Sequence, residues 1–286
     1  MAVYKRGYQR YTGPLADRQT RLLAFPRFAW RRLLEQRLVV GALMLSVIPV
    51  LFATLLIYIA NNQDLWKGLG LGGTRLLNIN SDFFLVFMNT QAAFAVIVAA
   101  LTGPSLVAPD LANGGLALYF SRPLTRSEYV AARMIVLAGL LSLLTWVPGM
   151  LLFLMQWSLT GSEWAWSNWN IASGIVVGSA MWIVFVGLAA LASSAWVKWR
   201  IIAGALVLAL FFVTVGVGEV INAVFRERWG SYINPSMNMG NIWRALFGMD
   251  PARGLEVEFS VLSLAAMAAV FGLALARKLR AVEVVR

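Results

Sequence analysis

The stretch APDLANGGLALYFSRPLTRSEYVAAR, residues 108–133, separates two long apolar runs and is polar enough to leave a membrane. Pro109, Gly114 and Gly115 are expected to end the helix before it, since proline lacks an amide donor and glycine favours turns. Pro123 is expected to stop any short helix that precedes it. The stretch therefore predicts an ordered turn between two membrane spans.

Thr125 followed by Glu128 is a capping box, so a new helix is predicted to start at Arg126. We call residues 108–128 the elbow. Its composition predicts a docking surface, and the alternative is an ordinary ordered connection between spans. The side chains that suggest docking, in the elbow and just after it, are Arg122, Arg126 and Arg133 with the aromatic pair Tyr119 and Phe120.

The composition of the chain excludes a soluble globular protein. Of its 286 residues, 60% are hydrophobic and 13% are charged, and the mean hydropathy is +0.73. Soluble domains carry roughly 25% charged residues. The chain has no cysteine and no histidine, which excludes disulfides, thiolate metal sites and histidine-based acid–base chemistry.

Six apolar runs are long enough to cross about 30 Å of hydrocarbon, which takes roughly 20 helical residues. The fold class predicted is an all-α polytopic membrane protein, with one six-span domain over residues 38–286 after an N-terminal segment, 1–37. The predicted spans are 38–60, 83–107, 129–155, 171–195, 201–222 and 259–276.

The distribution of basic residues predicts the orientation. Most lysines and arginines fall in segments 1–37, 108–128 and 196–200 and in the C-terminal tail, which lie on one side of a six-span chain. The positive-inside rule then places both termini and the elbow in the cytoplasm of a multi-pass protein of the inner (plasma) membrane. This placement explains the net charge of +11 without a nucleic-acid partner.

Residues 26–38 have helical periodicity and are predicted to form an amphipathic helix in the inner membrane interface. The alternative is a solvated basic lead-in to the first span. The apolar stripe consists of Trp30, Leu33, Leu34 and Leu38, and the charged face carries Arg27, Arg31 and Glu35.

The outer segment 225–258 is too long for a simple turn. Asn234-Pro235-Ser236 is expected to start a short helix and Gly248 to end it, which predicts a partly re-entrant element shielded by protein. The apolar face of that helix consists of Ile242, Trp243, Leu246 and Phe247.

No motif predicts catalysis. The glycine-rich run around Gly70 lacks a following Lys-Ser/Thr and a preceding strand, so a flexible outer loop is expected instead of a phosphate site. The acids are scattered and form no D-x-x-D pair, which disfavours metal-dependent chemistry. We predict no catalytic residue, no metal site and no cofactor in this chain.

Polar residues within the apolar runs are candidates for a pathway. Glu219 lies near the outer end of the fifth run, where a carboxylate that simply reaches the interface is an equally good interpretation. Asn89, Thr90 and Gln91 should face protein or a water-filled cavity, and hydrogen bonds between helices would explain them equally well. Gly174 and Gly178 form a G-x-x-x-G that predicts close helix packing.

The elbow resembles the pattern found between the second and third spans of membrane subunits of ABC-2-type exporters. The matching residues are Asp110, then Gly114-Gly115-Leu116, then Leu118-Tyr119-Phe120-Ser121-Arg122-Pro123-Leu124-Thr125-Arg126, with Tyr129 after them. The topology and the Asn234-Pro235 and Leu246-Phe247-Gly248 steps of the last outer loop agree with it. One departure is Phe120, which stands where the pattern has leucine.

The resemblance implies a permease half that pairs with a second half, expected to be an identical copy, and binds two cytoplasmic ATPase subunits that carry ATP and Mg²⁺. It implies that the elbow couples to the ATPases through Asp110, Gly115, Tyr119, Phe120, Ser121, Arg122, Pro123, Thr125, Arg126 and Glu128. It also implies a connecting helix with Arg27, Trp30, Arg31 and Leu34, and a pathway near Asn89, Gln91, Thr214 and Glu219.

Two alternatives belong to other functional classes. A polytopic membrane enzyme or assembly factor working without ATP would need a catalytic cluster, which the sequence does not offer. A secondary transporter would need an ionisable residue at mid-membrane to couple ions. A neighbouring reading frame with a nucleotide-binding loop would favour the exporter.

Overall fold

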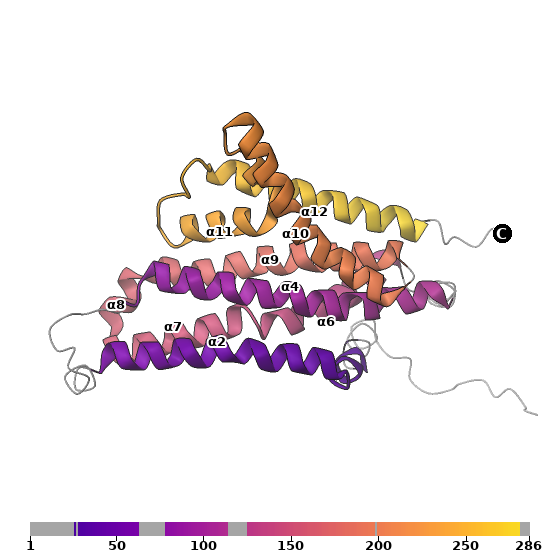
Figure 1. Ribbon diagram of the computed structural model, residues 1–286. Coiled ribbons are helices and arrows are strands. Elements are labelled where there is room, and N and C mark those ends of the chain that lie inside the picture. The colour runs from indigo at the N-terminus through magenta and orange to yellow at the C-terminus, as the bar shows by residue number, and fades with distance from the viewer. Residues whose placement is uncertain (1–25, 27, 63–77, 114–124, 198, 281–286) are drawn as a thin grey trace, which may run out of the picture.

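The regular elements of the protein are helices that run side by side (Figure 1). A computed structural model describes residues 26, 28–62, 78–113, 125–197 and 199–280, and every regular element within them is helical. Six helices are long and apolar enough to cross a membrane. The predicted fold class and the six predicted spans are therefore confirmed.

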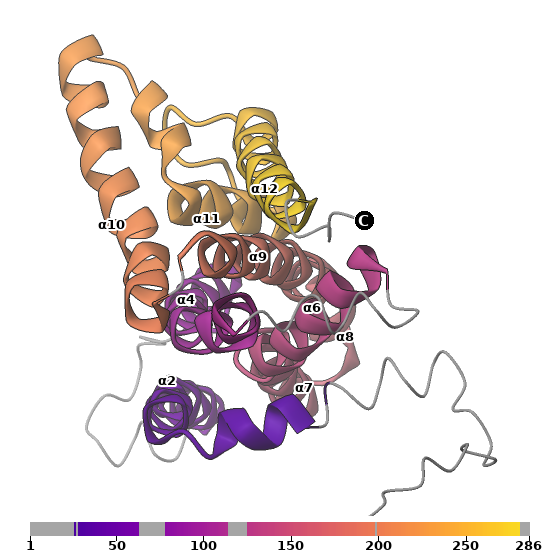
Figure 2. The same ribbon diagram turned by 90° about the vertical axis from the view of Figure 1, so that its right-hand side faces the viewer.

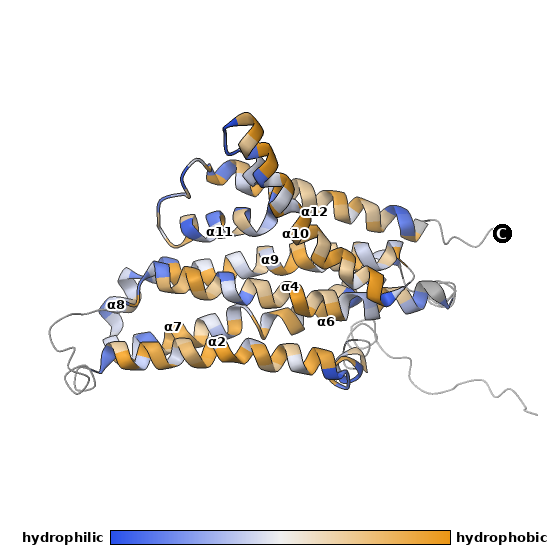
Figure 3. Cartoon of the chain, in the orientation of Figure 1, coloured by the Kyte–Doolittle hydropathy of each residue, from blue (hydrophilic) through white to orange (hydrophobic). Residues whose placement is uncertain are grey.

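The spans are α2 (Arg37–Asn61), α4 (Ser81–Ala112), α6 (Arg126–Ser142) continued by α7 (Trp146–Thr160), α9 (Trp169–Trp196), α10 (Arg200–Phe225) and α12 (Val257–Arg280). Three short elements connect them: α8 (Ser162–Ser167), η1 (Trp229–Ile233) and α11 (Pro235–Leu246). Figure 3 shows the apolar middle of the helices and the polar residues at their ends.

The helices α4 and α9 form the centre of the bundle and pack against each other (Figure 2). On one side α2 packs against α4 and α7, and α6 packs against α9 and α4. On the other side α11 and α12 pack against α9. The helix α10 contacts α4 and η1 and leans away from the bundle along its length (Figure 1). We call the end of the bundle where α4 ends and α6 begins the elbow end.

The helix α4 runs through Pro109 and ends at Ala112, so the prediction that Pro109 breaks it is wrong. Neighbouring side chains support its last turns. Ser194 of α9 accepts a hydrogen bond from the Ala108 amide at 2.9 Å and donates to the Pro104 carbonyl at 3.4 Å. The Ser194 hydroxyl thus inserts between two backbone groups that an undisturbed helix would pair directly.

The third span is broken, which the apolar run did not predict. The helix α6 ends at Ser142 and α7 restarts at Trp146, so that Pro148 lies in the first turn of α7. Proline is tolerated there because the first amides of a helix have no intrahelical partner. Thr145 donates its hydroxyl to the Leu141 carbonyl at 2.9 Å, and this carbonyl also accepts hydrogen bonds from the Leu144 and Thr145 amides.

The predicted boundaries of the short helix in the outer segment 225–258 are confirmed. Asn234 caps α11 by accepting hydrogen bonds from the Ser236 and Met237 amides, Pro235 is the first helical residue, and Gly248 follows the helix with φ 73°. The helix packs between α9 and α12, with Ile242, Trp243 and Phe247 buried.

The G-x-x-x-G of α9 receives α11. A Cβ placed on Gly178 would lie 2.1 Å from Trp243 Nε1, and one on Gly174 would lie 2.7 Å from the ring of Phe247. The close helix packing predicted for these glycines is present, and its partner is the short re-entrant helix.

The N-terminal amphipathic helix is shorter than predicted. Residues 28–34 are helical, and Gln36 is extended before α2 starts at Arg37. Arg31 pairs with Glu35 at 3.8 Å, as the spacing suggests. Arg27 and the glycine-rich loop around Gly70 lie outside the described residues.

Candidate functional site

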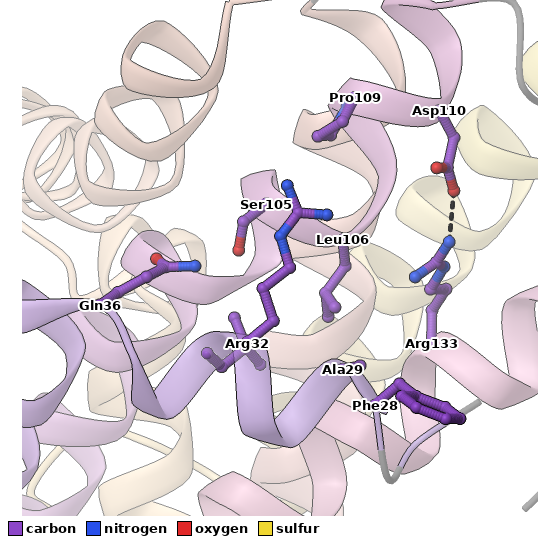
Figure 4. Close-up of a pocket in the computed structure, with 10 residues that line it drawn as sticks. Phe28, Ala29, Arg32, Gln36, Ser105, Leu106, Pro109, Asp110 and Arg133 are labelled. Carbon is purple, nitrogen blue, oxygen red and sulfur yellow. Dashed lines mark hydrogen bonds and ion pairs between the residues drawn. The ribbon is translucent and has the colours of Figure 1, made fainter. Parts of the chain in front are cut away.

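At the elbow end, α4 and α6 are joined by a buried cluster of Asp110, Tyr129 and Arg133, which we call the Asp110 cluster. The Tyr129 hydroxyl donates a hydrogen bond to Asp110 Oδ2 at 2.8 Å. An Arg133 Nη2 donor binds the same carboxylate oxygen in an ion pair (Figure 4). The Arg133 guanidinium also lies over the Tyr129 ring, 5.0 Å from its centre.

The Asp110 cluster is largely removed from solvent. The side chain of Arg133 is 6% exposed and that of Asp110 is 19% exposed. A buried ion pair of this kind gains little net stability, but removing one partner leaves an uncompensated charge and costs about 3–5 kcal/mol. The cluster therefore fixes the spacing of the two helices between which the elbow runs.

The helix α6, which the chain enters at the end of the elbow, begins with a complete capping box. Thr125 Oγ1 accepts a hydrogen bond from the Glu128 amide at 3.3 Å, and Glu128 Oε2 accepts one from the Thr125 amide at 2.9 Å. The predicted start of the helix at Arg126 is confirmed. Two orphan donors at the helix start are thus satisfied by side chains, which sets where the chain enters α6.

The helical segment 28–34 docks on α6. Trp30 Nε1 donates a hydrogen bond to the Val136 carbonyl at 3.0 Å. The Trp30 ring lies so close to Gly139 that a Cβ there would be 2.1 Å from it. Leu33 is buried, whereas Phe28 and Leu34 are exposed. The segment is therefore held against the helix that leaves the elbow.

Other helix ends at the elbow end are joined by polar contacts over long sequence separations. Gln36, before α2, accepts a hydrogen bond from Arg200 at the start of α10. Trp196 Nε1 donates to the Ala274 carbonyl at 3.2 Å, and Lys278 lies 5.2 Å from the centre of the Trp196 ring. These contacts tie α9 to α12 and α2 to α10.

The arrangement can transmit force, because both arms of the elbow enter helices that are clamped to each other and to segment 28–34. Among the residues that the structure describes, no group of three or more histidine, cysteine, aspartate or glutamate side chains is placed to hold a metal ion. At this end the elbow therefore connects two helices that are held together by side-chain contacts.

Some of the predicted coupling residues belong to the Asp110 cluster or to the start of α6, and the others lie outside the described residues. Asp110 joins the two helices, and Thr125 and Glu128 form the cap, with Arg126 as the first residue of α6. The remaining predicted coupling residues lie outside the described residues: Gly115, Tyr119, Phe120, Ser121, Arg122 and Pro123.

The structure does not bring the predicted pathway residues together. Gln91 is fully buried and donates to the Ser46 carbonyl of α2 at 3.1 Å, which is a contact between helices. Asn89 is exposed, donates to Leu85 within its own helix and lies beside Gly240 of α11. Thr214 donates within α10, and Glu219 is exposed.

Glu219 lies in the second half of α10, away from the start of that helix at the elbow end. It lines a cavity of about 320 Å³ together with Asn222, Arg226 and Glu227, between α10, η1 and α11.

Sequence reasoning missed the burial of Arg133, which it counted among the cations of a docking surface. The available signal was one residue of each charge at the two ends of the elbow, Asp110 near its start and Arg133 just after it. Antiparallel helices joined by a short connection place such residues side by side. The role of Ser194 had no signal, because its partners lie about 90 residues away in the sequence.

Comparison with protein-family models finds no match, and comparison with curated proteins finds no similar sequence. The identification therefore depends on the chain's own sequence and structure. On that evidence, the chain is a polytopic membrane protein with six candidate spans.

Proposed function

We propose that the chain is the permease subunit of an ATP-driven exporter of the ABC-2 type. In this proposal two copies form the membrane pathway, both termini lie in the cytoplasm, and separate cytoplasmic ATPase subunits bind the elbow. The observation that carries the proposal is the Asp110 cluster, in which an acid at the end of α4 is tied to two residues of α6.

A permease that does not hydrolyse ATP itself needs a connection that moves together with its ATPase partner as a rigid unit. A loop that only links two spans needs neither a buried ion pair at its base nor a docked helix beside it. Here α4 ends two residues after Asp110, the chain enters α6 through a capping box, and Trp30 fixes segment 28–34 to α6. Force applied to the elbow would reach the central helices of the bundle.

The motif supports the same proposal. The serine-arginine-proline-leucine step Ser121 to Leu124 lies between the two arms that the Asp110 cluster joins. Arg122 in this step and the aromatic pair directly before it, Tyr119 and Phe120, are the expected contacts with an ATPase groove.

The proposal is tested by purifying the tagged full chain from its native membranes and identifying the proteins that accompany it. We expect the wild type to retain an ATPase with a nucleotide-binding loop. The double variant Tyr119→Ala/Arg122→Glu should lose it while keeping the elution volume and melting temperature of the wild type.

A matched control makes the same two chemical changes at the opposite end of the bundle. Trp229 is 74% exposed and Arg253 is exposed, so Trp229→Ala/Arg253→Glu should retain the ATPase. Equal retention by the elbow variant, or no ATPase with the wild type, would contradict the proposal. The polytopic enzyme or assembly factor would then be the remaining candidate.

A further inference from the structure

A pocket of about 170 Å³ lies at the elbow end between segment 28–34 and the last turns of α4. Its polar wall includes Arg32, Gln36 and Ser105, and the Asp110–Arg133 pair forms one side (Figure 4). The pocket is formed by parts of the chain about 70 residues apart. It is therefore a product of the docked segment 28–34 and would not exist without that docking.

The charge in this pocket is positive. Asp110 and Arg133 neutralise each other, since the guanidinium and the carboxylate form an ion pair. Arg32 makes no ion pair with any residue in the described part of the chain, and its side chain extends toward Ser105 (Figure 4). The neighbouring Arg31 pairs instead with Glu35, and Arg31, Glu35 and Arg32 are all exposed.

One amide hydrogen-bond donor lies beside the same space. Gln36 accepts from Arg200 through its amide oxygen, which leaves its amide nitrogen as a donor. Figure 4 shows the Gln36 side chain directed toward Ser105. An arginine fork with a nearby amide donor suits a phosphate group, because guanidinium forms short charge-assisted hydrogen bonds to phosphate oxygens.

Apolar side chains next to the pocket point to the source of that phosphate. Phe28 lines it and is 76% exposed. Leu38, two residues after Gln36 at the start of α2, is 75% exposed. The pocket is lined by the last turns of α4 and by segment 28–34. Figure 3 shows that the apolar middle of the helices gives way to polar residues at their ends. A free phosphate would gain nothing from these side chains, whereas the acyl chains of a lipid would cover them.

We propose that this pocket binds the phosphate headgroup of an anionic phospholipid through Arg32 and Gln36, with the acyl chains lying over Phe28 and Leu38. Basic pockets between membrane helices bind anionic headgroups in this way. The bound lipid would link segment 28–34 to α4, beside the Asp110 cluster. The proposal does not depend on the ATPase partner.

The test measures lipid retained by the full chain in nanodiscs made from equal amounts of phosphatidylglycerol and phosphatidylcholine with identical acyl chains. After extraction into detergent, native mass spectrometry counts the lipids that remain bound. We expect the wild type to retain phosphatidylglycerol in preference to phosphatidylcholine. Arg32→Ala should lower that retention about tenfold, because a charged hydrogen bond to phosphate is lost.

The matched control is Arg31→Ala, which removes one positive charge from the adjacent residue and should leave retention unchanged. Arg32→Gln, which keeps a polar side chain without the charge, should behave like Arg32→Ala, and all three variants should keep the wild-type melting temperature. Equal retention by Arg32→Ala, or an equal loss with Arg31→Ala, would overturn the site. Displacement of the lipid by an equal concentration of inorganic phosphate would overturn the lipid as its ligand.

Discussion

The elbow end and the α11 region hold short elements against the bundle by different means. At the elbow end a few strong polar contacts do so, above all the ion pair of Asp110 with Arg133 and the Trp30 bond to Val136. At α11 the means are close packing on Gly178 and buried neutral amides, Asn238 and Asn241.

The buried amides of α11 bind irregular backbone. Asn241 accepts from the Ala252 amide at 2.8 Å and donates to Ser260 at 3.0 Å, and Asn238 donates to the Tyr232 carbonyl at 2.7 Å. Non-helical backbone at membrane depth needs such partners within the protein. The helix α11 is therefore part of the packed bundle, whereas the elbow end is held by a few separate contacts that single substitutions can release.

The largest effect is expected for Asp110→Ala, which removes the carboxylate that binds the buried Arg133 side chain. The free energy of unfolding should fall by about 3–5 kcal/mol, measured by denaturant titration in detergent. Asp110→Ala/Arg133→Leu should recover most of this loss because no buried charge remains. A single variant as stable as the wild type would show that the ion pair does not clamp the two helices.

Gly178→Ala probes the α11 side of the comparison. The new methyl group would collide with the Trp243 ring, and overpacking of this kind costs about 1–3 kcal/mol. Gly216→Ala is the matched control, since a Cβ on Gly216 meets no atom within 4 Å. It should stabilise α10 by roughly 0.5–1 kcal/mol. Equal melting temperatures for the two variants would contradict the packing described here.

Trp30→Phe keeps an aromatic ring near Gly139 but removes the hydrogen bond to Val136. A loss of about 1 kcal/mol is expected, with faster hydrogen exchange in segment 28–34 and unchanged exchange in α11. Faster exchange in both regions would show that the N-terminal segment is not an independently clamped element.

Thr125→Ala should have a similar or smaller effect, since loss of an N-cap costs about 1 kcal/mol. The change should appear as faster amide exchange confined to the first turn of α6. Thr125→Ser keeps the hydroxyl and should restore the wild-type rate. If the serine variant exchanges as fast as the alanine variant, the capping box does not hold the start of α6.

Hydropathy predicted the six spans because the length of an apolar helix that crosses a bilayer is a local property of the chain. The capping box at Thr125 and the limits of α11 were also readable, since caps depend on neighbouring residues. The continuation of α4 through Pro109 could not be predicted from the sequence, because Ser194 and the Asp110 cluster support that end of the helix through residues of other helices. Burial of Arg133 likewise depends on which helices become neighbours.

The central claim is that the elbow contacts a cytoplasmic ATPase. The most direct test places a photo-crosslinking amino acid at Tyr119 or, as a control at the opposite end, at Trp229, and irradiates cells that express the full chain. We expect position 119 to cross-link to a protein with a nucleotide-binding loop and position 229 not to do so. Cross-linking to such a protein from neither position, or equally from both, would contradict the claim.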